Sequence, residues 1–262
     1  MSRNRERAIT LRYQAKRERG EIVHGKIASE NYAYYEQDSQ YSWGYPDSPL
    51  LDRYSISKKY PSIDSTFRDV VPREHVNIKS DIETTLLPKK GSAIAIEVGG
   101  IGSTLFQGFT DGFFQRTAGV CLTDYRNIID PTLKPIDIRR NHTVIPGDIT
   151  TPETKAKVKD FLGNQKADLI MSRMEAGRYL LPDAPRFMGK QADFWYRQLA
   201  EGGLLYVQLP PSFQPYMENW IETIESQYKG KIEITYSIFS HLRLHKLQGA
   251  PEHLPLVPLK LD

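Results

Sequence analysis

The sequence predicts an α/β fold: an open, mostly parallel, doubly wound sheet with an N-terminal helical and irregular extension and an antiparallel C-terminal edge. From about residue 90, short apolar runs alternate with amphipathic stretches, which is the rhythm of βαβ units in a parallel sheet. Near the C-terminus, the runs KIEITYSIF and HLRLHKL follow one another with an alternation of period two. This second pattern predicts an antiparallel pair at the sheet edge.

Each expected strand is a short apolar run bounded by turn residues. The strands of the parallel part are expected at 92–98, 119–125, 142–149, 166–173 and 204–209. The helices between them are expected at 103–116, from 152 onward, at 187–201 and at 213–228. Thr151 and Pro152 predict the start of the second helix, because they supply a hydroxyl cap and a proline at the first helical position. Gly202 and Gly203 are expected to end the third helix, and the proline-rich tail from Ala250 is expected to run extended along the surface.

The composition limits the classes of protein that the chain can represent. With 262 residues, 39% hydrophobic and 26% charged, it suits a globular protein with one large α/β domain. No apolar run approaches the ~20 residues that cross a bilayer, and the N-terminal segment lacks the apolar stretch of a leader peptide. The single cysteine, Cys121, excludes an internal disulfide framework and a cysteine-rich zinc site. The histidines are scattered and indicate no metal site, so we expect a cytoplasmic protein without a membrane partner.

The first part of the chain differs from the rest, which suggests a division into residues 1–88 and residues 89–262. Residues 1–26 carry eight basic and three acidic side chains, a net charge of +5, so the remaining chain is net −2. Residues 32–60 hold seven of the fifteen tyrosines, and a helix is expected over 74–87. The basic arm is interpreted either as a solvated segment or as a contact for an anionic partner.

The stretch AIAIEVGGIGSTLFQGF, residues 93–109, joins the first expected strand to the segment after it. In an open α/β sheet, ligands bind at the carboxyl ends of the strands, so this turn is the natural binding site. A dinucleotide would require a third glycine where Leu105 stands. The turn GGIGS also resembles the ATP-binding loop of ubiquitin-activating and sulfur-carrier adenylating enzymes, although Glu97 replaces a glycine of that loop.

A third interpretation uses Glu97, which precedes the turn that holds Gly99, Gly100 and Gly102. An acidic residue followed by a glycine-rich loop resembles motif I of the class I S-adenosylmethionine-dependent methyltransferases. In that family the acidic residue lies near the ammonium group of the cofactor's methionine part, and no glycine is needed to pack against a pyrophosphate. Two of the three glycines frequent in the family's loop are replaced in this chain.

The later strands continue the same resemblance in the same order. Asp124 ends the second expected strand, where the family places the acid that accepts hydrogen bonds from both ribose hydroxyls. Asp148, with Ile149 beside it, resembles the family's Gly-Asp pair, whose carboxylate reaches the adenine amino group. The runs ADLIMSR and LAEGGLLYVQ are similar to the fourth strand and to the helix and strand that follow. The resemblance covers roughly residues 90–245 and implies a class I methyltransferase-like fold with S-adenosylmethionine as cofactor. Taken alone, Asp124 is also compatible with a capping role and Asp148 with an ordinary loop.

Arg173 and Glu175 stand just past the fourth strand, where the family meets its substrate. Glu175 is the candidate catalytic residue, because a hydroxyl acceptor would need a general base. An ion pair between the two residues at the sheet edge is the alternative. The segment SRMEAG stands where amino-group base methyltransferases of the family carry an Asn/Asp-Pro-Pro-aromatic signature, which disfavours that reaction.

A small-molecule acceptor is the favoured substrate at this stage, with Tyr34, Tyr35 and Tyr41 in the wall of its pocket. The reason is electrostatic: the chain after the arm is net −2, with no second basic cluster evident in the sequence. An RNA acceptor is the alternative, because tyrosines stack on unpaired bases and an arginine-rich arm neutralises phosphates. A catalytically inactive, partner-binding methyltransferase-like subunit is the third possibility.

Overall fold

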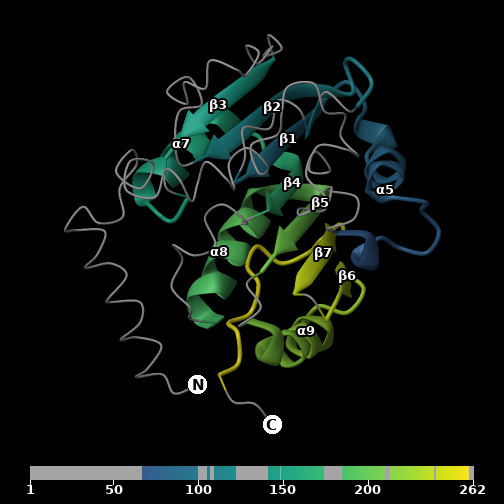
Figure 1. Ribbon diagram of the computed structural model, residues 1–262, viewed down its shortest axis with the longest axis vertical. Helices are drawn as coiled ribbons and strands as arrows, with labels where there is room; N and C mark the ends of the chain where they lie inside the picture. Colours follow the sequence, from purple (N-terminus) through teal and green to yellow (C-terminus); the bar gives the residue numbers. More distant parts are fainter. Residues whose placement is uncertain are drawn as a thin grey trace, which may run out of the picture.

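The computed structural model describes residues 67–99, 105–106, 109–121, 141–147, 149–173, 185–209, 213–238 and 240–259. These residues form a seven-stranded sheet with the strand order β3-β2-β1-β4-β5-β7-β6 (Figure 1). The strands are β1 (Ala93–Val98), β2 (Phe114–Cys121), β3 (His142–Pro146), β4 (Ala167–Arg173), β5 (Leu199–Gln208), β6 (Ile232–Tyr236) and β7 (His241–Lys246). The five strands β1 to β5 run parallel, and β7 pairs antiparallel with both β5 and β6. The predicted fold class, including its antiparallel C-terminal edge, is confirmed.

Helices cover both faces of the sheet. They are η1 (Arg68–Val70), α5 (Ile78–Thr85), η2 (Leu87–Lys89), α7 (Pro152–Leu162), α8 (Pro185–Gln198) and α9 (Gln214–Gln227). The side chains of β1 divide between two hydrophobic cores, because successive residues of a strand point to opposite faces. Ile94 and Ile96 join the core under α7, α8 and α9, whereas Ala93 and Ala95 join the core under η1 and α5.

Local sequence signals explain where two of the helices begin. Asn77 caps α5: its side chain accepts a hydrogen bond from the Ser80 amide at 2.8 Å, and the Ser80 hydroxyl accepts one from the Asn77 amide. Thr151 caps α7 in the same way, accepting from the Thr154 amide at 3.2 Å, with Pro152 at the first helical position. The start predicted for α7 is therefore confirmed. Such caps satisfy amide groups that have no partner within the helix.

The helix predicted over residues 103–116 is wrong in its second half. Residues 105–106 are helical, but residues 109–113 form turns, and β2 already begins at Phe114. The apolar residues of this segment do share one surface, as predicted, because Leu105, Phe106, Phe109 and Phe113 all lie in the core under α5. The spacing of these aromatic side chains therefore matches that of a helical face, although the segment includes a turn and the start of a strand.

The end predicted for α8 is also wrong. The helix ends at Gln198 and β5 starts at Leu199, so Gly202 and Gly203 lie inside the strand rather than at a helix terminus. The pairing of β4 with β5 steps from Ala167–Leu199 to Leu169–Leu204, which is an irregularity that these residues accommodate. Between these two pairs β4 advances by two residues and β5 by five, and glycine often stands where a strand is irregular in this way.

The tail after Ala250 has no regular secondary structure through residue 259, and the prediction that it runs along the surface is wrong for part of it. Leu254 and Val257 are buried in the core under α8 and α9. The tail is held by backbone acceptors: Pro251 accepts from the Tyr196 hydroxyl at 3.1 Å, and Pro255 accepts from the Trp220 indole at 2.9 Å. The tail therefore covers this core beside α8 and α9.

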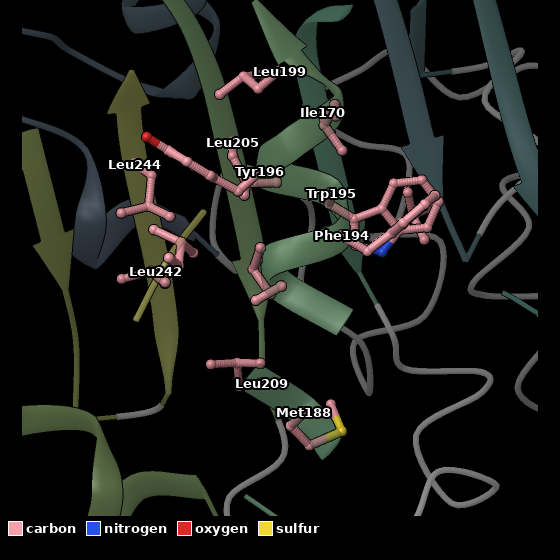
Figure 2. Close-up of a cluster of buried hydrophobic side chains, with 14 of the residues drawn as sticks. Ile170, Met188, Phe194, Trp195, Tyr196, Leu199, Leu205, Leu209, Leu242 and Leu244 are labelled. Carbon is pink, nitrogen blue, oxygen red and sulfur yellow. The ribbon is translucent and has the colours of Figure 1, made fainter. Parts of the chain in front are cut away.

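Helix α8 anchors the same core by side chains that point in opposite directions (Figure 2). Phe194 and Trp195 extend to one side of the helix and pack edge to face, with ring centroids 4.8 Å apart. Tyr196 extends to the other side, toward β7, where the Lys246 ammonium lies 4.4 Å from its ring centroid. Burial lowers the pKa of Lys246 and raises that of Tyr196, because a low dielectric favours the neutral form of both groups.

On the opposite face, a buried ion pair joins α5 to the antiparallel edge. The Asp81 carboxylate is fully buried and accepts hydrogen bonds from Arg243 Nε at 2.7 Å and Nη2 at 2.8 Å. It also accepts one from the Tyr206 hydroxyl on β5. Burial acts to lower the pKa of Arg243, but the hydrogen bonds and charge of Asp81 outweigh it, and the net shift is upward. One carboxylate on α5 therefore contacts side chains from both β5 and β7.

We expect Asp81→Asn to lower the free energy of unfolding by about 3–5 kcal/mol, because an amide leaves the buried Arg243 guanidinium without a compensating charge. Urea denaturation of the purified variant would measure the loss. Glu83→Gln is the matched control, since Glu83 lies on the same helix and forms only a 3.8 Å pair with Lys79 at half-exposed positions. It should cost less than about 0.5 kcal/mol. If both variants lose the same amount, the Asp81–Arg243 pair is not the anchor of α5.

Candidate active site

The carboxyl ends of five neighbouring strands meet at one edge of the sheet. The register shows this directly, since Val98 of β1 pairs with Val120 of β2 on one side and with Ser172 of β4 on the other. Cys121 pairs with Pro146 at the end of β3, and the last residues of β4 and β5 pair with each other. In an open α/β sheet this edge is where ligands bind.

Glu97 lies at the centre of this edge. It is on β1 between Gly119 of β2 and Met171 of β4, and its side chain is only 1% exposed. Gly99 follows with a φ of +93°, a conformation that residues with a Cβ rarely adopt, and its amide donates to the Val120 carbonyl at 2.8 Å. An acidic residue near the end of the strand, with a glycine of positive φ two residues later, agrees with the start of the glycine-rich turn that the sequence predicts here.

The next predicted positions follow the ends of the adjacent strands. Ile149 is nearly buried and packs in the core with Ile145 and Val158, three residues after β3 ends. Arg173 is the last residue of β4, and only its backbone is described. Other predicted site residues lie outside the described residues: Gly100, Gly102, Asp124, Asp148, Glu175, Tyr34, Tyr35 and Tyr41. In sequence, Asp124 and Asp148 stand three and two residues beyond the last residues of β2 and β3.

The turn between β3 and α7 brings the end of the strand close to the start of the helix. A Cβ on Gly147 would overlap the hydroxyl of Thr154, so glycine is required by the close approach of backbone to side chain. The Thr154 hydroxyl in turn accepts a hydrogen bond from Thr151 at 3.0 Å. Gly147 therefore lies at a tight strand-to-helix junction on the candidate edge.

Two polar residues at this edge were missed by sequence reasoning. Ser172 on β4 is fully buried and Gln208 on β5 is 8% exposed. Neither the Ser172 hydroxyl nor the side-chain amide oxygen of Gln208 has a hydrogen-bond partner among the described residues. Unpartnered buried polar atoms are rare and call for an explanation such as an absent ligand. The available signal was a polar residue at the end of an otherwise apolar strand, in ADLIMS and in LLYVQ.

A basic groove lies between α7 and α8, which we call the α7–α8 groove. It is an open cavity of about 410 Å³ that begins at Thr150, beside the end of β3, and includes residues from both helices. Four cationic side chains line it: Lys155, Lys159, Lys190 and Arg197. The expectation that the chain has no second basic cluster is therefore wrong, because residues 35 positions apart in sequence are brought together by the fold.

Two kinds of feature are absent from the described residues. None of their helices is long and apolar enough to cross a membrane. No group of three or more His, Cys, Asp or Glu side chains among them is placed to hold a metal ion.

Comparison with known proteins gives one local sequence similarity and several similar folds. No family model matches the chain. The chain is 36% identical over 83 residues to the ribosomal RNA large subunit methyltransferase E of Gluconobacter oxydans (strain 621H), a match that covers 30% of this chain and 31% of that protein. The chain thus spans about a third of the length of this curated relative.

Solved structures of methyltransferases are similar at low identity. The O-methyltransferase of Bacillus cereus, in complex with S-adenosylhomocysteine, is 12% identical, with a TM-score of 0.40 over 76% of this chain and 95% of that one. A methyltransferase from the mycinamycin biosynthetic pathway is 13% identical, with a TM-score of 0.42 over 69% of this chain and 48% of that one. The conclusion on fold comes from the sheet itself, whose five parallel strands have the Rossmann-like order 3-2-1-4-5. With the antiparallel pair at its edge, the chain has the class I fold of the S-adenosylmethionine-dependent methyltransferases, the family that its sequence motifs resemble.

Proposed function

We propose that the protein is an S-adenosylmethionine-dependent methyltransferase. The observation that carries the proposal is Glu97, a buried carboxylate near the carboxyl end of the central parallel strand, with the positive φ of Gly99 two residues later. In the family that the sequence motifs resemble, the acidic residue at this position lies near the ammonium group of the cofactor's methionine part, and Glu97 would do the same, directly or through water. A pyrophosphate would instead be repelled by an acidic residue at this position, which disfavours NAD and ATP.

The residues of the candidate edge fit the other parts of this cofactor. Asp124, beyond the end of β2, would accept hydrogen bonds from the ribose hydroxyls, and Asp148, beyond the end of β3, would accept from the adenine amino group. Gly99, Gly100 and Gly102 would allow the backbone close to the ligand, and Ile149 would supply an apolar contact. The unpartnered oxygens of Ser172 and Gln208 at the same edge are consistent with a polar ligand there.

When bound, the cofactor supplies an electrophilic methyl group, so the protein's task is to hold the acceptor atom in line with it. Positioning of this kind supplies much of the rate without a covalent intermediate. Arg173 at the end of β4 would contact the acceptor. Glu175 would take the proton from a hydroxyl acceptor as that oxygen forms its new bond to carbon.

The acceptor class has two candidates. A small molecule, bound against Tyr34, Tyr35 and Tyr41, was favoured by the net charge of −2 beyond the basic arm. RNA is supported by the local similarity to a ribosomal RNA methyltransferase and by the basic α7–α8 groove. A non-catalytic, partner-binding role and a cytoplasmic location stay predictions.

We expect the purified chain to bind S-adenosylmethionine or S-adenosylhomocysteine in isothermal titration calorimetry, and NAD or ATP much more weakly. The reason is the acidic residue at 97, which suits an ammonium group and opposes a phosphate. Tight binding of NAD without a signal for either adenosyl compound would refute the proposal. Binding of S-adenosylmethionine without turnover on any acceptor would instead support the partner-binding role.

Asp124→Ala should weaken binding of S-adenosylmethionine by roughly 1.5–3 kcal/mol, the usual contribution of a hydrogen bond to a charged group. The thermal unfolding midpoint should change little, because a residue beyond a strand's carboxyl end contributes little to the core. Asp160→Ala is the matched control, since Asp160 is exposed on α7, and its affinity should equal that of the wild type. A variant that is destabilised but binds normally would assign Asp124 a structural role.

Deletion of residues 1–26 separates the two acceptor classes. If RNA is the acceptor, the arm's net charge of +5 contributes phosphate contacts, and log affinity for RNA should fall with log salt by roughly 0.7 per contact. The deletion should then flatten this slope in fluorescence anisotropy. If the acceptor is a small molecule, turnover should survive the deletion and respond little to salt.

A further inference from the structure

The α7–α8 groove has a positive charge that its own acidic residue does not balance. Its one carboxylate, Asp193, is already engaged: it accepts from the Leu254 amide at 2.8 Å and lies 3.2 Å from His253 in the tail. The Arg197 Nε atom is 3.9 Å from the same carboxylate. Lys159 and Lys190 are exposed and form no salt bridge among the described residues. The groove therefore presents positive charge to solvent from both of its walls.

The floor of the groove is apolar and aromatic. Phe194 contributes its ring, which is 5% exposed, and the Lys155 ammonium lies 4.9 Å from the ring centroid. This contact holds Lys155 over the floor while Lys159 stands one turn further along α7. A positively charged groove that follows the backbone is one of the features by which proteins bind single-stranded nucleic acid without sequence preference.

The direction of the groove connects it to the candidate active site. Thr150 lies four residues past the end of β3, so one end of the groove is at the ligand edge of the sheet. From there α7 and α8 both lie against the same face of the sheet, as the shared core of Val158, Leu162, Met188 and Ala192 shows. Lys159 lies seven residues along α7 from Pro152, about 10 Å at 1.5 Å per residue, so a small acceptor held at the edge would not extend to it. A polymer with regularly spaced negative charges would follow the groove away from the edge.

We propose that the α7–α8 groove is a binding site for the phosphate backbone of single-stranded RNA. The nucleotide to be methylated lies at the carboxyl edge of the strands. The methylation part rests on the proposed function, whereas the binding part does not. Lys159 on α7 and Lys190 on α8 contact phosphates from opposite walls. Phe194 and Lys155 form the surface between them.

The experiment measures binding of a fluorescent single-stranded RNA oligonucleotide to the full chain at several salt concentrations, without cofactor. We expect Lys159→Glu/Lys190→Glu to weaken binding at low salt and to reduce the slope of log affinity against log salt by about 1.4, the value for two single-strand phosphate contacts. The matched control is Lys90→Glu/Lys229→Glu, which makes the same change in net charge at two exposed lysines outside the groove. The control should keep both the affinity and the slope close to the wild type.

Equal losses in the two double variants would overturn the proposal, because binding would then depend on net charge alone. So would an unchanged slope in the groove variant. Both lysines are exposed, and equal thermal unfolding midpoints would verify that each variant is folded. DNA of the same sequence distinguishes the two polynucleotides: tighter binding of DNA would contradict RNA as the occupant. Calorimetry with S-adenosylmethionine on the same proteins tests the proposed function separately, since neither lysine lies at the cofactor's predicted residues.

Discussion

The common direction of the strands β1 to β5 is the constraint on which the candidate site depends. Parallel strands that run in the same direction end at the same edge of the sheet. Side chains from distant parts of the sequence therefore lie side by side there, even where they do not contact one another. Glu97, Ser172 and Gln208 belong to three different strands, yet the register places the ends of these strands side by side. The site is therefore a consequence of topology first and of particular side chains second.

The antiparallel strand β7 is held in the sheet by its pairing with β5 and β6. The fully buried Asp81 carboxylate adds contacts to this edge from outside the sheet. It contacts Arg243 of β7 and Tyr206 of β5 together, so α5 is tied to the strand pair at which the chain direction reverses. The Tyr206 pKa is raised well above its ordinary value, by burial and by the nearby carboxylate, so the hydroxyl remains a donor. Residues from 67–89 thus share a core with the sheet, although the division predicted from the sequence places residues up to 88 in a separate segment. That division stays a prediction.

The sequence was sufficient for the parts of the fold that follow from periodicity. The strand β1, the capped start of α7 and each strand of the antiparallel pair can be predicted from the local sequence of a single segment. One error concerns Phe106, Phe109 and Phe113, which have helical spacing. Residues 109–113 instead form turns, and Phe114 pairs with β1. The sequence predicts a helix end at Gly202 and Gly203. The irregular pairing that places them inside β5 depends on the partner strand β4, which the local sequence does not show. The buried, unpartnered oxygens of Ser172 and Gln208 could not be predicted, because burial is a property of the folded neighbours.

The same distinction explains why charge in the sequence gave an incomplete view of the possible partners. Net charge describes the field at a distance, where the acidic residues of the body offset its lysines. A ligand in contact with the surface instead experiences the nearest few charges, because screening at physiological salt limits interactions to about 8 Å. The charged side chains that line the α7–α8 groove are four cations and one carboxylate, and that carboxylate is held by the tail through Leu254 and His253. The C-terminal tail therefore has two effects on the molecule: it fills the core with Leu254 and Val257, and it engages the groove's one acidic side chain.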